Sequence, residues 1–211
     1  MIGYRILMGE ASGEYEEKKS KFIAVMRPVS SEQDALDFIA EIKKKRWDAR
    51  HNCSAFVLGK NNELTRCSDD GEPSGTAGRP MLEVLTGSGI HDVAVVVTRY
   101  FGGVLLGTGG LVRAYTQAVK NALESADTGV MRDGCRVVMN FPYRDIDTVK
   151  KYVEAEGVTT EQEDYLENVR FTCIFPEENY EKGVKDLVDK TGGRIIFSEP
   201  ERCSFLDKDK G

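Results

Sequence analysis

Short apolar runs separated by turn residues predict several strands in the first 130 residues. The runs at 21–29 and 49–58 are rich in branched and aromatic side chains, and 63–68 follows the second run after a turn at 59–62. This spacing is typical of a hairpin. At 93–97 every position is apolar, which predicts a strand buried on both of its faces.

Other stretches repeat their apolar residues at helical spacing. Ser30 and Gln33 form a capping box ahead of a helix that ends in the basic run 43–46, where positive charges suit the helix dipole. A short helix is predicted at 81–85, directly after a proline. A longer helix is predicted at 111–123, because apolar residues recur there along one face.

The second part begins after two turn signals between 127 and 134 and reads strand, helix, strand, strand, helix, strand. This is the order of a ferredoxin-like split βαβ arrangement. The chain is therefore predicted to be an α+β protein with two domains, 1–130 and 135–211. The predicted strands of the second domain are 136–141, 158–163, 168–175 and 194–197, and its predicted helices are 146–155 and 179–190.

Composition and charge narrow the class of protein. With 40% hydrophobic and 30% charged residues, the chain is typical of a folded, soluble protein, and no apolar run approaches the ~20 residues that a membrane span needs. Residues 1–134 hold 17 basic and 18 acidic side chains, and residues 135–211 hold 12 and 17. Most of the net charge of −6 therefore lies in the second part, and global charge does not indicate nucleic-acid binding.

The five cysteines are spread widely and form no Cys-x-x-Cys pair. This pattern argues against a disulfide framework and a zinc knuckle, and it favours a reducing compartment. The N-terminal residues lack the pattern of a secretory signal. We therefore expect a cytoplasmic protein.

Two polar, glycine-rich segments are the candidates for chemistry. The first, 67–80, is too long for a simple turn and carries three acids, three hydroxyls and three glycines. The second, 98–110, leaves the apolar strand at 93–97 and enters a helix, where backbone N–H groups can face an anion. It does not match either standard nucleotide-binding motif, because Thr108 stands where a P-loop needs lysine and Val112 where a dinucleotide-binding loop needs glycine. Its Arg99 is either a phosphate partner or the ion-pair partner of an acid in the first segment.

A third stretch places His51 and Cys53 on the same face of a predicted strand. The pair invites a nucleophile–base or a metal-ligand interpretation, but no supporting spacing accompanies either one. The basic run 43–46 is most simply a helix terminus. With Trp47 and Arg50 it is also a candidate for the edge of an RNA-facing surface.

The two polar segments, taken in order, resemble the signature of the IMPACT family, which includes the YigZ- and YvyE-like proteins of bacteria. The resemblance is carried by Asp-Asp-Gly-Glu-Pro-Ser-Gly-Thr-Ala-Gly-Arg-Pro at 69–80 and Val-Val-Val-Thr-Arg-Tyr-Phe-Gly-Gly-Val-Leu-Leu-Gly at 95–107. The stretches 20–22 and 51–53 fit the same family. The resemblance covers about 15–125, and the second part is similar to the small C-terminal domain of the bacterial members.

This resemblance implies an N-terminal domain of the ribosomal-protein type, with the left-handed βαβ crossover also found in domain IV of elongation factor G. It implies a C-terminal domain similar to the ferredoxin-like domain V of that factor. Eukaryotic relatives restrain an amino-acid-starvation kinase by occupying the kinase's activator, through an additional N-terminal domain. The chain starts almost directly at the shared domain, so we do not expect that partner here. The resemblance therefore implies the fold, and it implies the function by analogy alone.

These observations lead to the hypothesis of a translation-associated regulatory protein, non-enzymatic, that binds RNA or the ribosome where the two segments meet. Arg99 and Arg79 would contact phosphate. Hydroxyl or backbone donors would come from Thr76, Gly78, Gly102, Gly103, Thr108 and Gly109.

The acids of the first segment lead to an alternative function. Asp69, Asp70 and Glu72, with His51 in support, would hold the arginines or a cation under the leading hypothesis. In the alternative, the three acids serve as metal ligands or general base of an enzyme that acts on a small phosphorylated or anionic substrate. A second alternative is a protein-interaction module with a translation-regulatory partner. The leading hypothesis requires no cofactor, no resident metal and no membrane.

Overall fold

A computed structural model describes residues 3–207, and the chain forms two compact units within it. The N-terminal unit is residues 4–129, and the C-terminal unit holds the described residues from Val130 onward together with Gly3. Each unit combines a sheet with helices, which confirms the predicted α+β class. The domain limits 1–130 and 135–211 stay a prediction, and their outermost residues, 1–2 and 208–211, lie outside the described residues.

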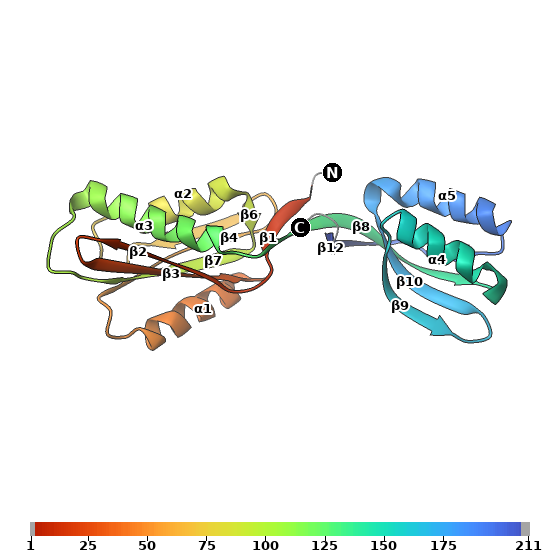
Figure 1. Cartoon of the computed structure of the whole chain (residues 1–211), viewed down its shortest axis with the longest axis horizontal. Helices are drawn as coiled ribbons and strands as arrows, with labels where there is room; N and C mark the ends of the chain where they lie inside the picture. Colours follow the sequence, from red (N-terminus) through yellow and green to blue (C-terminus); the bar gives the residue numbers. More distant parts are fainter. Residues whose placement is uncertain (1–2, 208–211) are drawn as a thin grey trace. The chain divides into compact units, whose positions relative to one another are not determined.

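The N-terminal unit is built on a five-stranded antiparallel sheet (Figure 1). Its strand order is β2-β3-β7-β4-β5, and every neighbouring pair is antiparallel. The hairpin of β4 and β5 and the central position of β7 agree with the sequence pattern. The strands are β2 (Ala11–Glu17), β3 (Ser20–Pro28), β4 (His51–Leu58), β5 (Leu64–Ser68) and β7 (Val93–Tyr100).

Helices cover both faces of this sheet. One face carries α1 (Glu32–Lys45), and the other carries α2 (Gly78–Ser88) and α3 (Gly107–Glu124) (Figure 1). Side chains of β7 alternate between the two cores: Val95 and Val97 pack toward α2 and α3, and Ala94 and Val96 pack toward α1. The prediction of a strand buried on both faces is therefore confirmed.

Several boundaries of the N-terminal unit differ from the prediction. Strand β2 was not predicted, and neither were β1 (Tyr4–Leu7) and β6 (Ile90–His91), which pair in parallel. The cap of α1 is Ser31, not Ser30, because the Ser31 hydroxyl accepts the N–H of Asp34. Both α2 and α3 begin several residues before their apolar stripes, since glycines and polar residues form their first turns.

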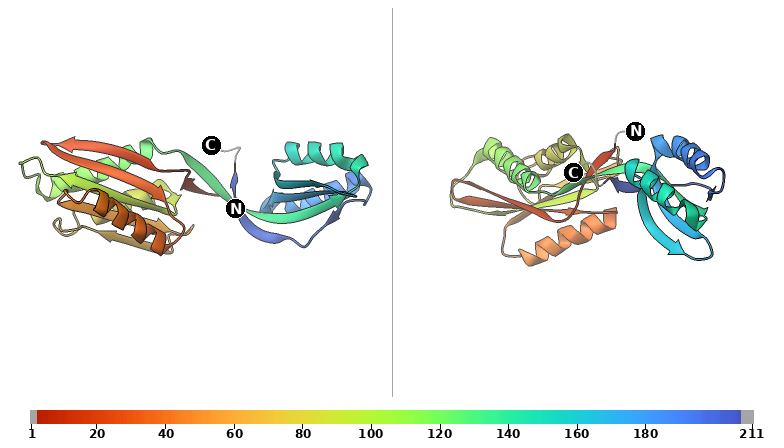
Figure 2. Two further views of the ribbon diagram at one scale, coloured as in Figure 1. Left: turned by 90° about the horizontal axis from the view of Figure 1, so that it is seen from below. Right: turned by 45° about the vertical axis from the view of Figure 1, so that its right-hand side comes forward.

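The C-terminal unit has the order β-α-β-β-α-β, with both helices on one face of its sheet (Figure 2). The strands lie in the order β9-β10-β8-β11, all neighbours antiparallel. Apolar side chains of β8 and β10, among them Met139 and Phe171, pack beneath the helices. The elements are β8 (Thr128–Phe141), α4 (Ile146–Ala155), β9 (Thr159–Tyr165), β10 (Val169–Pro176), α5 (Tyr180–Thr191) and β11 (Ile196–Phe197). The first two residues of β8 belong to the N-terminal unit.

The turns predicted between 127 and 134 are wrong. Gly129 and Gly134 lie inside β8, which runs unbroken from Thr128. Gly134 is needed there for packing, because a Cβ at this position would come within 2.8 Å of side-chain atoms of Ile174 and Phe205. Phe205 belongs to β12 (Glu201–Asp207), a strand that also pairs with β8 and that the sequence pattern did not reveal.

Two further features concern the cysteines and the helices. All five cysteines are free. In the part of the chain from 3 to 207, no helix has the length and apolar character needed to cross a membrane.

Candidate functional site

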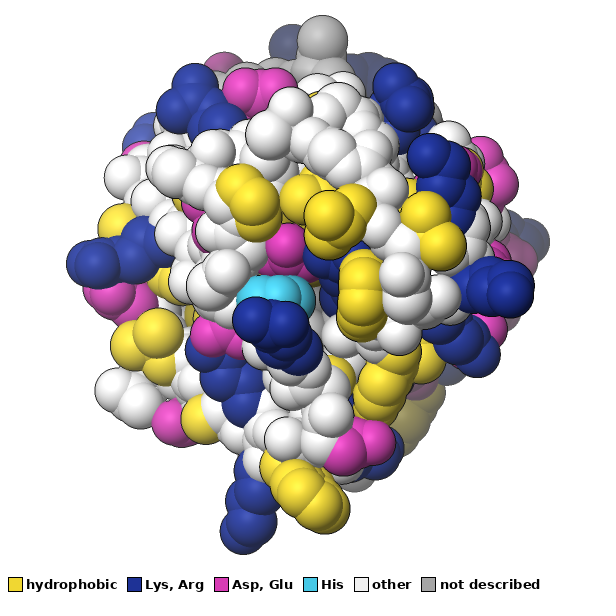
Figure 3. Space-filling view, turned by 90° about the vertical axis from the view of Figure 1, so that its left-hand side faces the viewer, with side chains coloured by type: hydrophobic (Ala, Val, Ile, Leu, Met, Phe, Trp, Pro, Cys, Tyr) yellow, Lys and Arg dark blue, Asp and Glu magenta, His cyan; other side chains and the backbone are white. Residues whose placement is uncertain are grey.

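A pocket of about 380 Å³ opens at one end of the N-terminal unit, where β7 ends and α3 begins. Its walls come from the start of β4, the loop after β5, the end of β7 and the loop that leads into α3. Figure 3 looks onto this end of the unit and shows a histidine at a hollow, with basic and acidic side chains beside it and apolar side chains around it. The pocket therefore joins the two polar segments that the sequence singled out.

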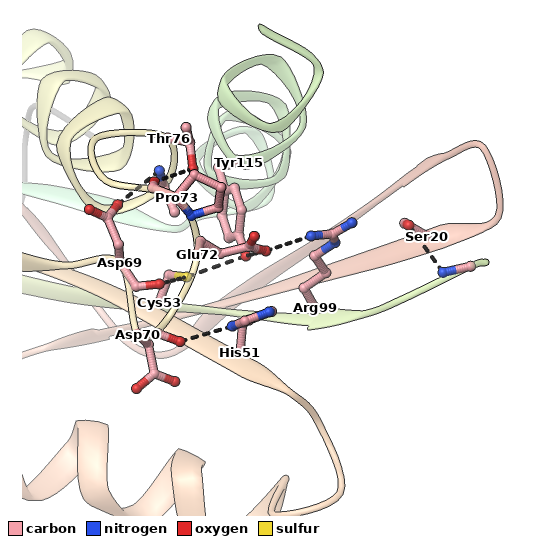
Figure 4. Close-up of polar contacts among 12 residues, drawn as sticks. Ser20, His51, Cys53, Asp69, Asp70, Glu72, Pro73, Thr76, Arg99 and Tyr115 are labelled. Carbon is pink, nitrogen blue, oxygen red and sulfur yellow. Dashed lines mark hydrogen bonds and ion pairs between the residues drawn. The ribbon is translucent and has the colours of Figure 1, made fainter. Parts of the chain in front are cut away.

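The inner wall of the pocket contains a buried ion pair. The Nη1 of Arg99 donates to the Oε1 of Glu72 at 2.7 Å, and the two side chains are only 8% and 2% exposed. The hydroxyl of Tyr115 donates to the same carboxylate oxygen at 2.8 Å (Figure 4). Of the alternatives left open for Arg99, the ion pair is the one observed, and its partner is Glu72.

The guanidinium of Arg99 also lies between two aromatic rings, with its central carbon 5.6 Å from the ring centre of Phe22 and 5.5 Å from that of Phe101. Its Nε is buried and has no hydrogen-bond partner among the residues that the structure describes. A buried N–H of a charged group without an acceptor is costly. The Arg99 side chain therefore contains one buried donor that the described residues leave without an acceptor.

Asp69, the first residue after β5, connects the loop after β5 to the start of α2. Its carboxylate accepts the backbone N–H groups of Gly75, Ala77 and Gly78 at 2.8 to 3.0 Å. Burial opposes ionisation of Asp69, but these three hydrogen bonds outweigh it and hold its pKa below the usual value. Asp69 is thus occupied inside the loop and does not reach an arginine of the site.

Asp70 is likewise occupied. It receives the ammonium of Lys43 at 2.6 Å and the backbone N–H of Asn52 at 2.7 Å. Burial works against its charge, yet the Lys43 and Asn52 contacts lower its pKa overall. Its backbone carbonyl lies 2.9 Å from the Nδ1 of His51, which fixes the imidazole at the pocket (Figure 4).

Cys53 does not form a nucleophile–base pair with His51. Its thiol donates to the carbonyl of Asp69 at 3.0 Å and also lies 3.3 Å from the Tyr115 hydroxyl. Burial raises the pKa of Cys53 to about 12 and also raises the pKa of Tyr115. The thiol is therefore protonated near neutral pH, and Cys53 belongs to the buried network behind the pocket.

The mouth of the pocket is formed by the start of α3 and the loop before it. The residue before the helix, Leu106, offers no side-chain cap, so the first N–H groups of this 18-residue helix have no side-chain acceptor there. Gly107 and Thr108 line the pocket, and Gly109 lies in the same first turn. Phe101, half exposed, and Leu105, 83% exposed, form an apolar rim.

Arg50 is the free cation at this mouth. Its side chain lines the pocket and is exposed, and it has no hydrogen bond or ion pair within residues 3–207. Because the negative groups nearby are engaged by Lys43 and Arg99, Arg50 leaves the pocket with an unbalanced positive charge.

Other residues predicted for the site lie outside the pocket. Arg79 is 71% exposed and pairs with Glu83 on its own helix at 3.0 Å. The Thr76 hydroxyl donates to the carbonyl of Pro73 at 2.6 Å. Gly78 and Gly102 serve close packing, since a Cβ on them would come within 2.8 Å of Ser68 and 2.1 Å of Lys19 backbone atoms, respectively. Gly103 has a φ of +85° in the loop before α3.

Sequence reasoning missed three residues of the site: Tyr115, Phe101 and Leu105. Tyr115 was counted only as part of the apolar face of a helix, and its hydroxyl was the one signal that a polar partner faced it. Phe101 and Leu105 lie in the glycine-rich loop, and their signal is that large, exposed apolar side chains in such a loop are typical of binding surfaces. No group of three or more His, Cys, Asp or Glu in the described part of the chain could hold a metal ion.

The fold and the site together define the class of protein. It is an α+β protein of two units, and its N-terminal unit has a pocket lined by arginine and glycine residues. Comparison with known proteins gives the family: the chain belongs to the IMPACT family. Residues 18–123 match the Impact N-terminal domain, and residues 139–194 match a domain of unknown function (DUF1949). The resemblance found in the sequence is confirmed.

Two bacterial relatives and one solved structure extend this match over nearly the whole chain. The chain is 39% identical to IMPACT family member YvyE of Bacillus subtilis, over 93% of this chain and 91% of the relative. It is 37% identical to an IMPACT family member of Haemophilus influenzae, over 93% and 97%. A crystal structure described as that of a hypothetical protein matches with a TM-score of 0.62 and 31% identity, over 93% and 97% of the two chains.

Proposed function

We propose that the protein is a translation-associated, non-enzymatic protein of the cytoplasm that binds RNA, free or in the ribosome, through the pocket end of its N-terminal unit. The observation that carries the proposal is the meeting of Arg50, the uncapped start of α3 and the exposed Phe101 at one pocket. Cationic side chains and a helix N-terminus suit phosphate, and an aromatic ring suits a base.

The charges around the pocket support this proposal. Lys18 and Lys19 form the exposed turn between β2 and β3, whose backbone packs against Gly102 beside the pocket. The acids near the mouth are engaged by partners: Asp70 by Lys43, and Glu72 by Arg99. Exposed cationic side chains therefore lie around the pocket, although Glu16 and Glu17 precede the same turn and the whole chain carries −6.

The architecture adds support by analogy. The strand order β9-β10-β8-β11 with two helices on one face is the order expected for a ferredoxin-like domain. We propose that it corresponds to domain V of elongation factor G, and that the N-terminal unit corresponds to domain IV with its left-handed crossover. A pairing of these two domains would suit a partner in the translation apparatus, whether RNA, ribosome or a regulatory protein.

The contacts of the acids favour this proposal over an enzyme. A hydrolytic or metal-dependent enzyme needs a carboxylate free to take a proton or a metal ion. Asp69 instead accepts three backbone N–H groups, Asp70 holds Lys43, and Glu72 holds Arg99 and Tyr115. Each of the three carboxylates is therefore already engaged by contacts within the protein.

Binding of a fluorescently labelled single-stranded RNA, followed by anisotropy, tests the proposal. Arg50→Ala should weaken binding and lower the slope of log K against log salt by about one, because one phosphate contact is lost. Arg79→Ala is the matched control, since Arg79 is an exposed arginine of the same unit outside the pocket. Binding that is equally strong in wild type and Arg50→Ala, or no binding by wild type, would overturn the proposal.

A further inference from the structure

We infer that the turn between α1 and β4 binds an unpaired nucleotide of an RNA strand. The base stacks on Trp47, and Lys44, Lys45 and Arg50 contact the phosphates on either side of it. This inference rests on the proposed function: it adds a surface beside the pocket and states that the RNA is single-stranded there. It is carried by the exposure of Trp47, by the contacts that fix the turn, and by the charge of the segment 43–50.

Trp47 is the single tryptophan of the chain, and it is 83% exposed. Tryptophan is highly buried on average in folded proteins, because its large ring gains most from burial. Within residues 3–207, its indole N–H has no hydrogen-bond partner, and its ring contacts no other ring or cation. The fold therefore gains little from this side chain, and the ring is open to a partner.

The turn that carries Trp47 is fixed on both sides of this residue. On one side, the Nη1 of Arg46 donates to a backbone carbonyl of β3 at 3.3 Å. On the other, the carboxylate of Asp48 accepts the hydroxyl of Tyr100 in β7 at 3.2 Å, and the N–H of Ala49 donates back to the carbonyl of Arg46 at 3.1 Å. The ring is therefore presented from a preorganised turn, which reduces the entropy cost of binding.

The segment around the ring is strongly basic, with five basic and one acidic side chain in residues 43–50. Lys44 and Lys45, in the last turn of α1, and Arg50 are exposed, and none of the three forms a hydrogen bond or ion pair within residues 3–207. The single acid, Asp48, accepts the Tyr100 hydroxyl, and the acid of α1 one turn earlier is held by an arginine of β3. Free cations thus stand before and after the aromatic ring, an arrangement that suits the phosphates beside a stacked base.

The position of the turn connects this surface to the pocket. Arg50 lines the pocket and follows Trp47 by three residues, so their Cα atoms are at most about 11 Å apart. A strand with a phosphate at Arg50 can therefore place a neighbouring base on Trp47. Bases inside a duplex are stacked on one another and offer no face to a single ring, which is why the nucleotide bound here is unpaired.

The emission of Trp47 tests the stacking directly, because no other tryptophan contributes to it. We expect a 12-nucleotide oligouridine to quench this emission and a 12-base-pair RNA duplex to leave it unchanged. By anisotropy of the labelled oligouridine, Trp47→Ala should weaken binding about tenfold, the effect of losing one base–aromatic stack, and Trp47→Phe should weaken it less. Leu36→Ala, at an exposed apolar residue of the same helix, is the matched control and should bind as wild type does.

The lysines are tested by the dependence of binding on salt. Replacing Lys44 and Lys45 together by alanine should lower the slope of log K against log salt by about 1.4, since each contact to a single strand contributes about 0.7. Lys120→Ala removes an exposed lysine of α3 and should leave the slope unchanged.

The outcomes separate this inference from the proposed function. If Arg50→Ala weakens RNA binding while Trp47→Ala binds as wild type and no quenching occurs, the stacking inference is wrong and the proposed function stands. Equal effects of Trp47→Ala on oligouridine and duplex would also overturn the inference. If neither RNA binds, both are wrong. A shift of the Trp47 emission by phosphatidylglycerol vesicles, with none by oligouridine, would assign the surface to an anionic membrane and not to RNA.

Discussion

Arg99 has a structural task that limits what its replacement can reveal. Its side chain is 8% exposed, and its guanidinium is the ion-pair partner of the Glu72 carboxylate, whose side chain is almost fully buried. Removing one member of a buried pair leaves the other as an uncompensated charge in the interior. A loss of RNA binding in Arg99→Ala would therefore combine a binding defect with a folding defect, and Arg50 is the cleaner position for a binding test.

We predict that Arg99→Met lowers the free energy of unfolding by about 3–5 kcal/mol. Adding Glu72→Gln should restore part of this loss, because the double variant no longer buries an unpaired carboxylate. Urea denaturation followed by circular dichroism measures both values. Arg79→Met, an exposed arginine paired within its own helix, should change stability by less than about 0.5 kcal/mol. A loss below 1 kcal/mol in Arg99→Met would contradict the role given to the pair.

The residue scale also shows what a sequence can reveal about this site. The choice of Arg99 and Glu72 followed from their charge and their place in two polar segments, but the sequence could not choose among Asp69, Asp70 and Glu72 as partner. The partner is set by how the loop after β5 folds over the ends of β4 and β7. The sequence could not identify Tyr115 as a site residue. A tyrosine in the apolar face of a helix gives the same sequence pattern whether or not its hydroxyl makes a hydrogen bond.

At the scale of elements, Asp69 organises the loop that closes one side of the pocket. Three backbone N–H groups at the start of α2 depend on its carboxylate. We predict that Asp69→Ala destabilises the protein by about 1–2 kcal/mol, as for loss of a helix cap. Hydrogen exchange should locate the change at 69–78, with β3 and α1 unaffected. Unchanged protection of this loop would contradict the assignment.

The same loop should make stability fall in acid. The pKa values of Asp69 and Asp70 are lowered in the folded protein from 3.8, so their contribution is fully present above the unfolded pKa. It is lost as the pH falls below about 4 and through the folded values, because the unfolded state then takes up protons more readily. Urea midpoints from pH 7 to pH 3 measure this loss, and Asp69→Asn should show a smaller loss than wild type. An equal loss in both proteins would show that Asp69 does not contribute.

Glycines near the pocket should differ in their tolerance of a side chain. A Cβ at Gly102 would lie 2.1 Å from a backbone carbon of Lys19, whereas one at Gly87 in α2 meets nothing within 4 Å. We predict that Gly102→Ala is destabilising and that Gly87→Ala raises stability by about 0.5 kcal/mol. Thermal unfolding of the two variants measures the contrast. Similar melting temperatures for the two would mean that the turn at 18–19 moves freely away from Gly102.

The elements that sequence patterns missed are those whose residues are fixed by tertiary packing. Strand β2 contains Gly13 among alternating glutamates, and its glycine is required because a Cβ would lie 2.2 Å from the backbone of Ala122 in α3. Gly134 of β8 is a similar case, because its Cβ would meet Ile174 of β10 and Phe205 of β12 at 2.8 Å. By contrast, the predicted bounds of α4 are the observed ones, because the spacing of its apolar residues is a property of the local sequence.

At the scale of the whole molecule, the two parts of the chain differ in net charge, and this difference matters for the proposed binding of RNA. Residues 1–134 hold 17 basic and 18 acidic side chains, against 12 and 17 in residues 135–211. An RNA-binding role therefore depends on the local arrangement at the pocket end and not on overall attraction. Few phosphates can be contacted, and we expect binding that is selective and sensitive to salt.

Co-sedimentation with ribosomes tests the central claim most directly. The full chain and its Arg50→Ala and Arg79→Ala variants are pelleted with purified ribosomes at low and at moderate salt. We predict that wild type and Arg79→Ala pellet at low salt and less at moderate salt, because counterions are released on binding, and that Arg50→Ala pellets weakly at both. Pelleting of Arg50→Ala equal to wild type, or no pelleting of wild type at low salt, would contradict the account.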